Sequence, residues 1–132
     1  MHGLKGERVL MRIHIGERDK YNGEPLYWAI VSLLRERRLA GATVTRGIVS
    51  FGASSRIHAA RFVDFSLDMP IVIECVDTEK KIDSVLPELD KMVTGGLITL
   101  ERVEVITYRH HKAEQEIADD TAMRMTGSNP IT

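Results

Sequence analysis

The chain has little of several features that define common classes of protein. Its 132 residues include a single cysteine, Cys75, which excludes a disulfide framework and suits a reducing compartment. No apolar run approaches the roughly 20 residues that span a bilayer. The first twelve residues also lack the basic start and apolar stretch of a secretory signal. We therefore expect a cytoplasmic protein that is not inserted in a membrane.

Neither sign of charge dominates the sequence. Lysine and arginine total 18 against 19 acidic residues, for a net charge of −1. Binding to nucleic acid needs a concentrated positive field, so we expect no nucleic-acid partner. With 43% hydrophobic and 28% charged residues, the composition is that of an ordinary globular protein. We expect one domain over residues 1–110, followed by a polar tail over 111–132.

The periodicity of apolar residues predicts four strands and two helices. The strands are expected over residues 8–15, 43–51, 71–76 and 97–108. Helices are expected from Pro25 to a stop at Gly41, and from Thr78 to a stop at Gly95 and Gly96. This order predicts a ferredoxin-like α+β fold (βαββαβ), an antiparallel sheet with two helices on one face.

Three local features predict irregularities in these elements. Gly47 interrupts the second strand and indicates a bulge or a close backbone approach. Pro87 lies inside the second helix, so that helix should kink or break into two pieces. In the last strand the apolar parity changes between Leu100 and Val103, which suggests a bulge near residues 101–102.

The outer face of the sheet mixes apolar and charged side chains. Along the first strand it carries Leu10, Arg12 and His14. Along the third strand it carries either positions 72, 74 and 76 or the opposite set. Such a face is too apolar for water and too polar for a core, so we expect packing of subunits against it in a homo-oligomer.

The segment from Phe51 to Met69 is long for a domain of this size, and such loops are usually functional or disordered. A small-residue loop with arginines at its base can hold a phosphate or carboxylate through backbone N–H groups and guanidinium forks. The candidate anion-binding residues here are Arg46, Gly47, Gly52, Ser54, Ser55, Arg56 and His58. The alternative is that the loop charges are solvated and Arg46 pairs with a carboxylate across the sheet.

Two further groups are candidates for the same site. Glu17, Asp19 and Lys20 follow the end of the first strand, where they either line a cleft facing a neighbouring subunit or fix the geometry of a charged turn. Gly95 and Gly96 either present N–H groups to a phosphate or serve only as a helix stop.

Catalytic and metal chemistry find little support in the sequence. The histidines and Cys75 are scattered without the paired spacing of a zinc site, so we expect no metal. Cys75 falls in the middle of a strand, where an inert buried thiol is usual. We expect a protein that is not an enzyme. The alternative is a small enzyme that uses His58 with Asp19 or Glu17 as acid and base between subunits.

Four blocks of sequence, in order, are similar to one bacterial and archaeal family. They are RIHIGERDKY with GEPL (residues 12–26), GATV with RG and FGASSRIH (41–58), DMPIVIE (68–74) and GLITLE (96–101). With these blocks, residues 6–108 resemble the family of domain of unknown function 190.

Members of that family resemble the nitrogen-regulatory PII signalling proteins. The resemblance implies a trimer that binds an adenine nucleotide (ATP, ADP or AMP) between subunits. It also implies that the loop over residues 51–69 contacts a partner protein, such as an enzyme, a regulator or a membrane channel. The PII glycine loop after the second helix carries lysine, whereas here Gly95 and Gly96 are followed by Leu97. A ligand-free structural adaptor is the remaining alternative.

Overall fold

The structure, a computed structural model, describes residues 4–51, 57–59 and 68–109. The polar tail expected over residues 111–132 therefore lies outside the described residues.

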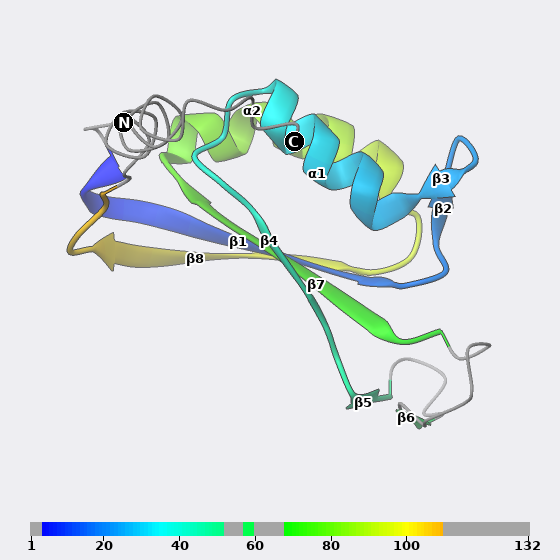
Figure 1. Cartoon of the computed structure of the whole chain (residues 1–132). Helices are drawn as coiled ribbons and strands as arrows, with labels where there is room; N and C mark the ends of the chain where they lie inside the picture. The colour runs from blue at the N-terminus through cyan, green and yellow to red at the C-terminus, as the bar shows by residue number, and fades with distance from the viewer. Residues whose placement is uncertain (1–3, 52–56, 60–67, 110–132) are drawn as a thin grey trace, which may run out of the picture.

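A four-stranded antiparallel sheet forms one layer, and two helices cover one of its faces (Figure 1). The helices are α1 (Leu26–Glu36) and α2 (Glu79–Met92). In the order β4-β7-β1-β8, the strands are Thr43–Arg46, Pro70–Asp77, Gly6–Gly16 and Leu97–Val105. This is the expected ferredoxin-like arrangement. Two small hairpins join β2 (Lys20–Tyr21) to β3 (Glu24–Pro25) and β5 (Val49–Ser50) to β6 (His58–Ala59).

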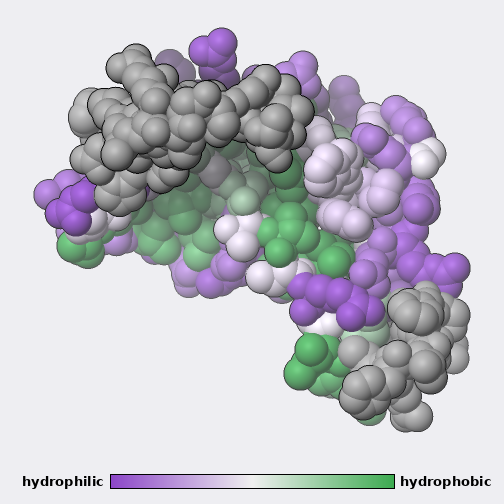
Figure 2. All heavy atoms as spheres, viewed as in Figure 1, coloured by the Kyte–Doolittle hydropathy of each residue, from purple (hydrophilic) through white to green (hydrophobic). Residues whose placement is uncertain are grey.

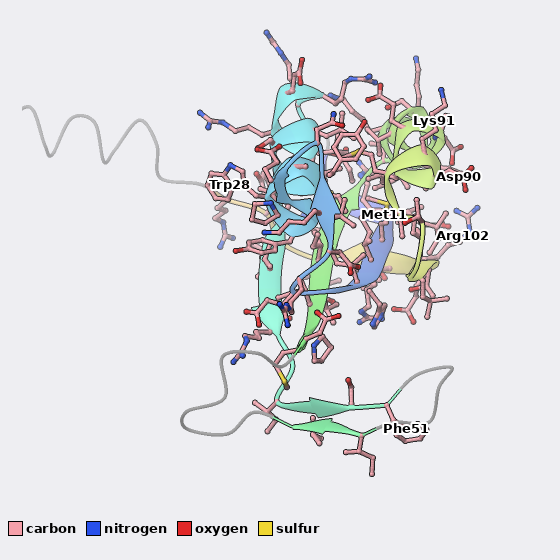
Figure 3. The ribbon with its side chains drawn as sticks, turned by 90° about the vertical axis from the view of Figure 1, so that its right-hand side faces the viewer. Met11, Trp28, Phe51, Asp90, Lys91 and Arg102 are labelled. Carbon is pink, nitrogen blue, oxygen red and sulfur yellow. The ribbon has the colours of Figure 1, made fainter. Side chains whose placement is uncertain are left out.

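Alternation along the central strand β1 decides which face the helices cover. Val9, Met11, Ile13 and Ile15 are buried, whereas the residues between them are only half-buried. Met11 lies between the sheet and the helices (Figure 3). In β7 the buried positions are 71, 73, 75 and 77, so the outer face carries the set 72, 74 and 76. The helices add their apolar stripes, which comprise Leu26, Ala29, Ile30, Leu33 and Leu34 of α1 and Ile82, Val85, Leu89 and Met92 of α2.

Helix α1 ends earlier than predicted and without the expected glycine. The helix stops at Glu36, and the residue with left-handed backbone is Arg38, at φ 62°, rather than Gly41. The Leu39 N–H donates to the Leu34 carbonyl at 3.0 Å, which together with the Arg38 bond to Arg35 forms a Schellman cap. Leu39 is buried, so its packing compensates the cost of a non-glycine residue in this conformation.

Helix α2 does not break at Pro87. It runs as one helix of 14 residues with Pro87 inside it. Proline removes the bond to the carbonyl of Asp83, but both residues are exposed, so water can satisfy that oxygen. Buried residues on both sides of the proline, Val85 and Leu89, hold the two halves on the same sheet.

The predicted bulge in β8 is wrong. The pairing with β1 keeps one register from Leu97 opposite His14 to Val105 opposite Gly6. The change in apolar parity arises because Leu100 lies on the helix side whereas Val103, opposite Arg8, lies on the outer face. The strand also ends at Val105, three residues earlier than expected.

The two glycines after α2 differ in what surrounds them. A Cβ atom on Gly96 would lie 2.3 Å from the backbone oxygen of His14, whereas nothing lies within 4 Å of a Cβ on Gly95. Gly96 therefore allows β8 to approach β1, and the structure gives Gly95 no comparable constraint.

This difference predicts contrasting effects of two similar substitutions. Gly96→Ala should lower the free energy of unfolding by about 3 kcal/mol, because β8 must move away from β1. Gly95→Ala should change it by less than about 0.5 kcal/mol. Chemical denaturation followed by circular dichroism measures both. Equal losses in the two variants would contradict the close approach at Gly96.

Candidate functional site

The chain segments before and after the 51–69 excursion are held side by side near the end of β1. The N–H of Gly47 donates to the Pro70 carbonyl at 2.7 Å, and the N–H of Glu17 donates to the Met69 carbonyl at 2.7 Å. The hydrogen bonds place residues from before and after the excursion at one point. We call the described residues there, 16–19, 46–47 and 68–70, the loop base.

Gly47 lies where the chain passes very close to Pro70. It separates β4 from β5, and a Cβ atom at this position would lie 2.5 Å from Cγ of Pro70. The glycine is therefore needed for a close approach to Pro70, and the prediction of such an approach is confirmed.

Arg46 and Glu17 meet at the loop base. The Nε atom of Arg46 donates to a carboxylate oxygen of Glu17 at 2.9 Å. The Arg46 side chain is 47% exposed, so the ion pair is in contact with water. The observed contact agrees with the alternative prediction, in which Arg46 pairs with a carboxylate. Among the residues that the structure describes, the two terminal nitrogens of Arg46 have no hydrogen-bond partner.

Two aspartates brace the loop base through backbone groups. Asp68 accepts the N–H of Arg18 at 2.9 Å, which ties the returning end of the excursion to β1. Asp19 accepts the N–H of Gly16 at 3.0 Å, and its carbonyl accepts the N–H of Leu26 at 2.8 Å. Asp19 therefore fixes a turn.

The remaining candidates are distributed around the same end of the sheet. Lys20 is exposed in β2, opposite Pro25. Gly95 and Gly96 precede Leu97, which pairs with His14 near the end of β1. His58 pairs with Ser50 in the β5–β6 hairpin, and its side chain is not described. Gly52, Ser54, Ser55 and Arg56 lie outside the described residues.

An acid–base pair with His58 gains no support from the described residues. The Glu17 carboxylate accepts from Arg46 and the Asp19 carboxylate accepts from the Gly16 N–H, so both proposed partners of His58 hold other groups. No cluster of three or more potential metal ligands occurs among residues 4–51, 57–59 and 68–109. Within the same residues no helix is long and apolar enough to cross a membrane.

A hollow at the opposite end of the sheet was not identified from the sequence. It has a volume of about 540 Å³ and an apolar lining that includes Leu10, Val76 and Val105. Glu74 also lines the hollow, and its carboxylate accepts a hydrogen bond from Nε of Arg12 at 2.8 Å on the outer face of the sheet. Residues 40–42 line one wall of the hollow, and this run of small residues is the feature of the sequence that could have indicated it.

Cys75 has the properties of an inert core thiol. It is buried under the helices, and burial, followed by the charge of Asp77, raises the pKa of its thiol from 9.0 to about 12. Asp77 itself is buried and accepts the N–H groups of Ala40 and Thr78. A thiol with so high a pKa is a poor nucleophile at neutral pH.

The raised pKa predicts a loss of stability at high pH. The folded state favours the neutral thiol, so this contribution is complete below pH 9 and is lost as the pH rises toward 12. The free energy of unfolding should therefore fall more steeply over this range in the wild type than in Cys75→Ala. Denaturation at a series of pH values measures both slopes. Identical slopes would show that Cys75 ionises equally in the two states.

The fold is that of PII-like proteins. It is similar to CPII, a nitrogen regulatory PII-like protein from Thiomonas intermedia K12, with a TM-score of 0.59 and 14% identity over 76% of this chain and 90% of that chain. A putative PII-like signaling protein from Thermus thermophilus gives a TM-score of 0.58 and 19% identity, over 83% of this chain and 95% of that chain.

Comparison of sequences shows the family of the chain. Residues 8–105 match the DUF190 family, described as "Uncharacterized ACR", and the chain belongs to that family. A UPF0166 protein of Aquifex aeolicus (strain VF5) is 38% identical over 100 residues, which cover 76% of this chain and 94% of the relative. The resemblance noted in the sequence is therefore confirmed.

Proposed function

We propose that this protein is a PII-like signalling module. It forms a trimer that binds a small anionic ligand between subunits, an adenine nucleotide such as ATP, ADP or AMP. Through the 51–69 excursion it contacts a partner protein, which is an enzyme, a regulator or a membrane channel. The observation that carries this proposal is the loop base, where a half-exposed arginine lies beside the fastened ends of the excursion.

The chemistry of a related fold supports an anionic ligand. CPII of Thiomonas intermedia K12 is bound to ADP, AMP and bicarbonate in one solved structure and to ADP and bicarbonate in another. Phosphate and bicarbonate both suit the planar fork of an arginine guanidinium such as that of Arg46.

The exposed ion pair allows a ligand to bind at low cost. A pair such as Arg46–Glu17 contributes at most about 1 kcal/mol to stability, so an anion can replace the Glu17 carboxylate at Arg46. Glu17 also holds Met69 through its backbone N–H, and Arg46 is followed by Gly47, which holds Pro70. A change of partner at Arg46 therefore affects the segments on both sides of the excursion. A ligand that binds more tightly when Arg46 is released from Glu17 then shifts the population of loop conformations toward that arrangement.

The other proposed ligand groups are Gly47, Glu17, Asp19, Lys20, Gly95 and Gly96, with Gly52, Ser54, Ser55, Arg56 and His58 on the excursion. In this proposal Asp19 and Glu17 shape the loop base, and the backbone N–H groups of the small residues approach the anion.

Thermal denaturation with ATP, ADP and AMP tests the proposal. A nucleotide at about 100 times its dissociation constant should stabilise the folded protein by about 2.7 kcal/mol, seen as a raised midpoint. Arg46→Ala should abolish that shift because it removes the anion's main charged contact.

Arg37→Ala is the matched control. Arg37 also forms an exposed ion pair, with Glu88, but it joins the two helices and lies away from the loop base. This variant should keep the nucleotide-dependent shift. If no adenine nucleotide moves the midpoint of the wild type, the proposal is wrong and the ligand-free adaptor is favoured.

A further inference from the structure

A second, smaller hollow lies beside the end of helix α1. It has a volume of about 290 Å³ and is lined by Val31, Leu34 and Arg35 of α1 and by residues 39–42. Leu34 and Leu39 are buried and Val31 is half-buried, so the hollow is apolar apart from the guanidinium of Arg35. We call this hollow the α1 groove. Figure 2, which looks onto β4, shows hydrophobic residues on this side of the molecule, below α1.

An exposed stripe of α1 continues the groove along the helix. Trp28, Val31 and Arg35 are spaced three and four residues apart, so their side chains lie along one side of α1. Trp28 is the only tryptophan of the chain and is 60% exposed. In Figure 3 it lies on the side of α1 that is away from α2. An exposed aromatic residue beside an apolar groove is typical of a surface that binds a polypeptide.

The charge at the α1 groove is positive. Among the residues that the structure describes, the side chain of Arg35 forms no hydrogen bond or ion pair, whereas the nearby Arg37 is held by Glu88. Glu36, the acidic residue of this turn, lies about 100° further around the helix than Arg35, on the side away from Val31. The α1 groove therefore favours an acidic segment that also carries an apolar side chain.

The C-terminal tail of the chain contains such a segment. Residues 113–120 read AEQEIADD, in which acidic residues surround Ile117 and no basic residue occurs. The acidic residues of this segment are Glu114, Glu116, Asp119 and Asp120. Its sequence therefore matches the α1 groove in charge and in polarity.

The tail also begins close to the α1 groove. Tyr108 lines the larger hollow of about 540 Å³, and residues 40–42 line both that hollow and the α1 groove. The five residues between Tyr108 and Glu114 can span about 17 Å. The acidic segment can therefore reach past residues 40–42 to the α1 groove. The larger hollow is a poorer site for it, because the carboxylate of Glu74 lies there and like charges repel.

We propose that the acidic segment 113–120 of the tail binds in the α1 groove of its own chain. Its carboxylates pair with Arg35, and Ile117 packs against the apolar lining. The bound segment covers the stripe that includes Trp28. This inference goes beyond the proposed function because it requires neither a ligand nor an oligomer. Its tests are made without nucleotide, so their outcome is separate from that of the nucleotide titration.

The first test is the quenching of Trp28 fluorescence by acrylamide in the full-length chain. Since Trp28 is the only tryptophan, the signal reports on this side of α1 alone. Arg35→Glu should raise the quenching constant, because it repels the acidic segment and uncovers Trp28. Replacing the four acidic residues of segment 113–120 by lysine should also raise the constant, because the segment is then repelled by Arg35.

A double reversal of charge separates this contact from other effects of the substitutions. Arg35→Glu combined with the four lysines in the tail should restore the wild-type quenching constant, because opposite charges face each other again. Circular dichroism should show folded protein for every variant. If folded Arg35→Glu keeps the wild-type quenching constant, or if the combined variant does not restore it, the acidic segment does not bind at Arg35.

Lys91→Glu is the matched control for the change of charge. Lys91 is exposed near the end of α2. The start of α2 is the part that lies beside the end of α1, where Nζ of Lys81 donates to the Arg38 carbonyl at 3.0 Å. Lys91→Glu therefore makes the same change of charge at a distance from the groove, and it should leave the quenching constant unchanged.

The second test is disulfide formation between the α1 groove and the tail. A disulfide requires Cα atoms within about 7 Å of each other. A chain that carries Val31→Cys with a cysteine at either Ala113 or Ala118 should form an intrachain disulfide on mild oxidation. Ser84→Cys on the exposed side of α2, used in place of Val31→Cys, should stay reduced. Cys75 is buried and unreactive, so it does not interfere.

The products of oxidation decide the outcome of this test. A product with twice the mass of the chain would show that the tail of a second copy occupies the groove, which would contradict the proposal. Folded protein that stays reduced with both tail cysteines, or that oxidises equally with Ser84→Cys, would show that the acidic segment is not held in the α1 groove.

Discussion

The function proposed for this fold depends on one constraint, the fastening of the chain where it leaves and rejoins the sheet around the 51–69 excursion. The Gly47–Pro70 and Glu17–Met69 hydrogen bonds bring three segments to one point at the end of β1. Close contact at Gly47 makes this geometry depend on a residue without a Cβ atom. In the proposed mechanism, these hydrogen bonds carry a change at the loop base to the segments on both sides of the excursion.

The sheet supplies a rigid support for that arrangement. Strand β1 is paired on both sides, by β7 and β8, and its alternate residues are buried under two helices. Met69 is held by Glu17, directly after this strand, so in the proposed mechanism a change at the loop base leaves the core of the domain in place. Ligand-responsive segments are generally drawn from the less stable parts of a structure, while the core stays intact.

Much of this architecture could be predicted from short-range patterns. The alternation of β1 and the apolar stripe of α1 are local properties of the sequence, and in each element the apolar side is buried. The interruption at Gly47 was also predictable because glycine within a strand usually marks a close approach.

Features that depend on tertiary packing were predicted less well. The cap of α1 uses Arg38 rather than Gly41, because Leu39 packs into the core and the Arg38 carbonyl accepts from Lys81 on α2. In β8, Val103 lies on the outer face, so a change in parity was interpreted as a bulge. The Arg46–Glu17 pair joins residues 29 positions apart and follows from strand order, so sequence reasoning left it as one of two alternatives.

The most direct test of the account is hydrogen exchange at the amides of the loop base, with and without saturating ADP. We expect ADP to change the protection of the Gly47 and Glu17 amides, which hold Pro70 and Met69, and to leave Ile13 in the centre of β1 unchanged. If ADP binds and the protection of Gly47 and Glu17 stays the same, ligand binding is not coupled to the ends of the excursion, and the proposed signalling mechanism is wrong.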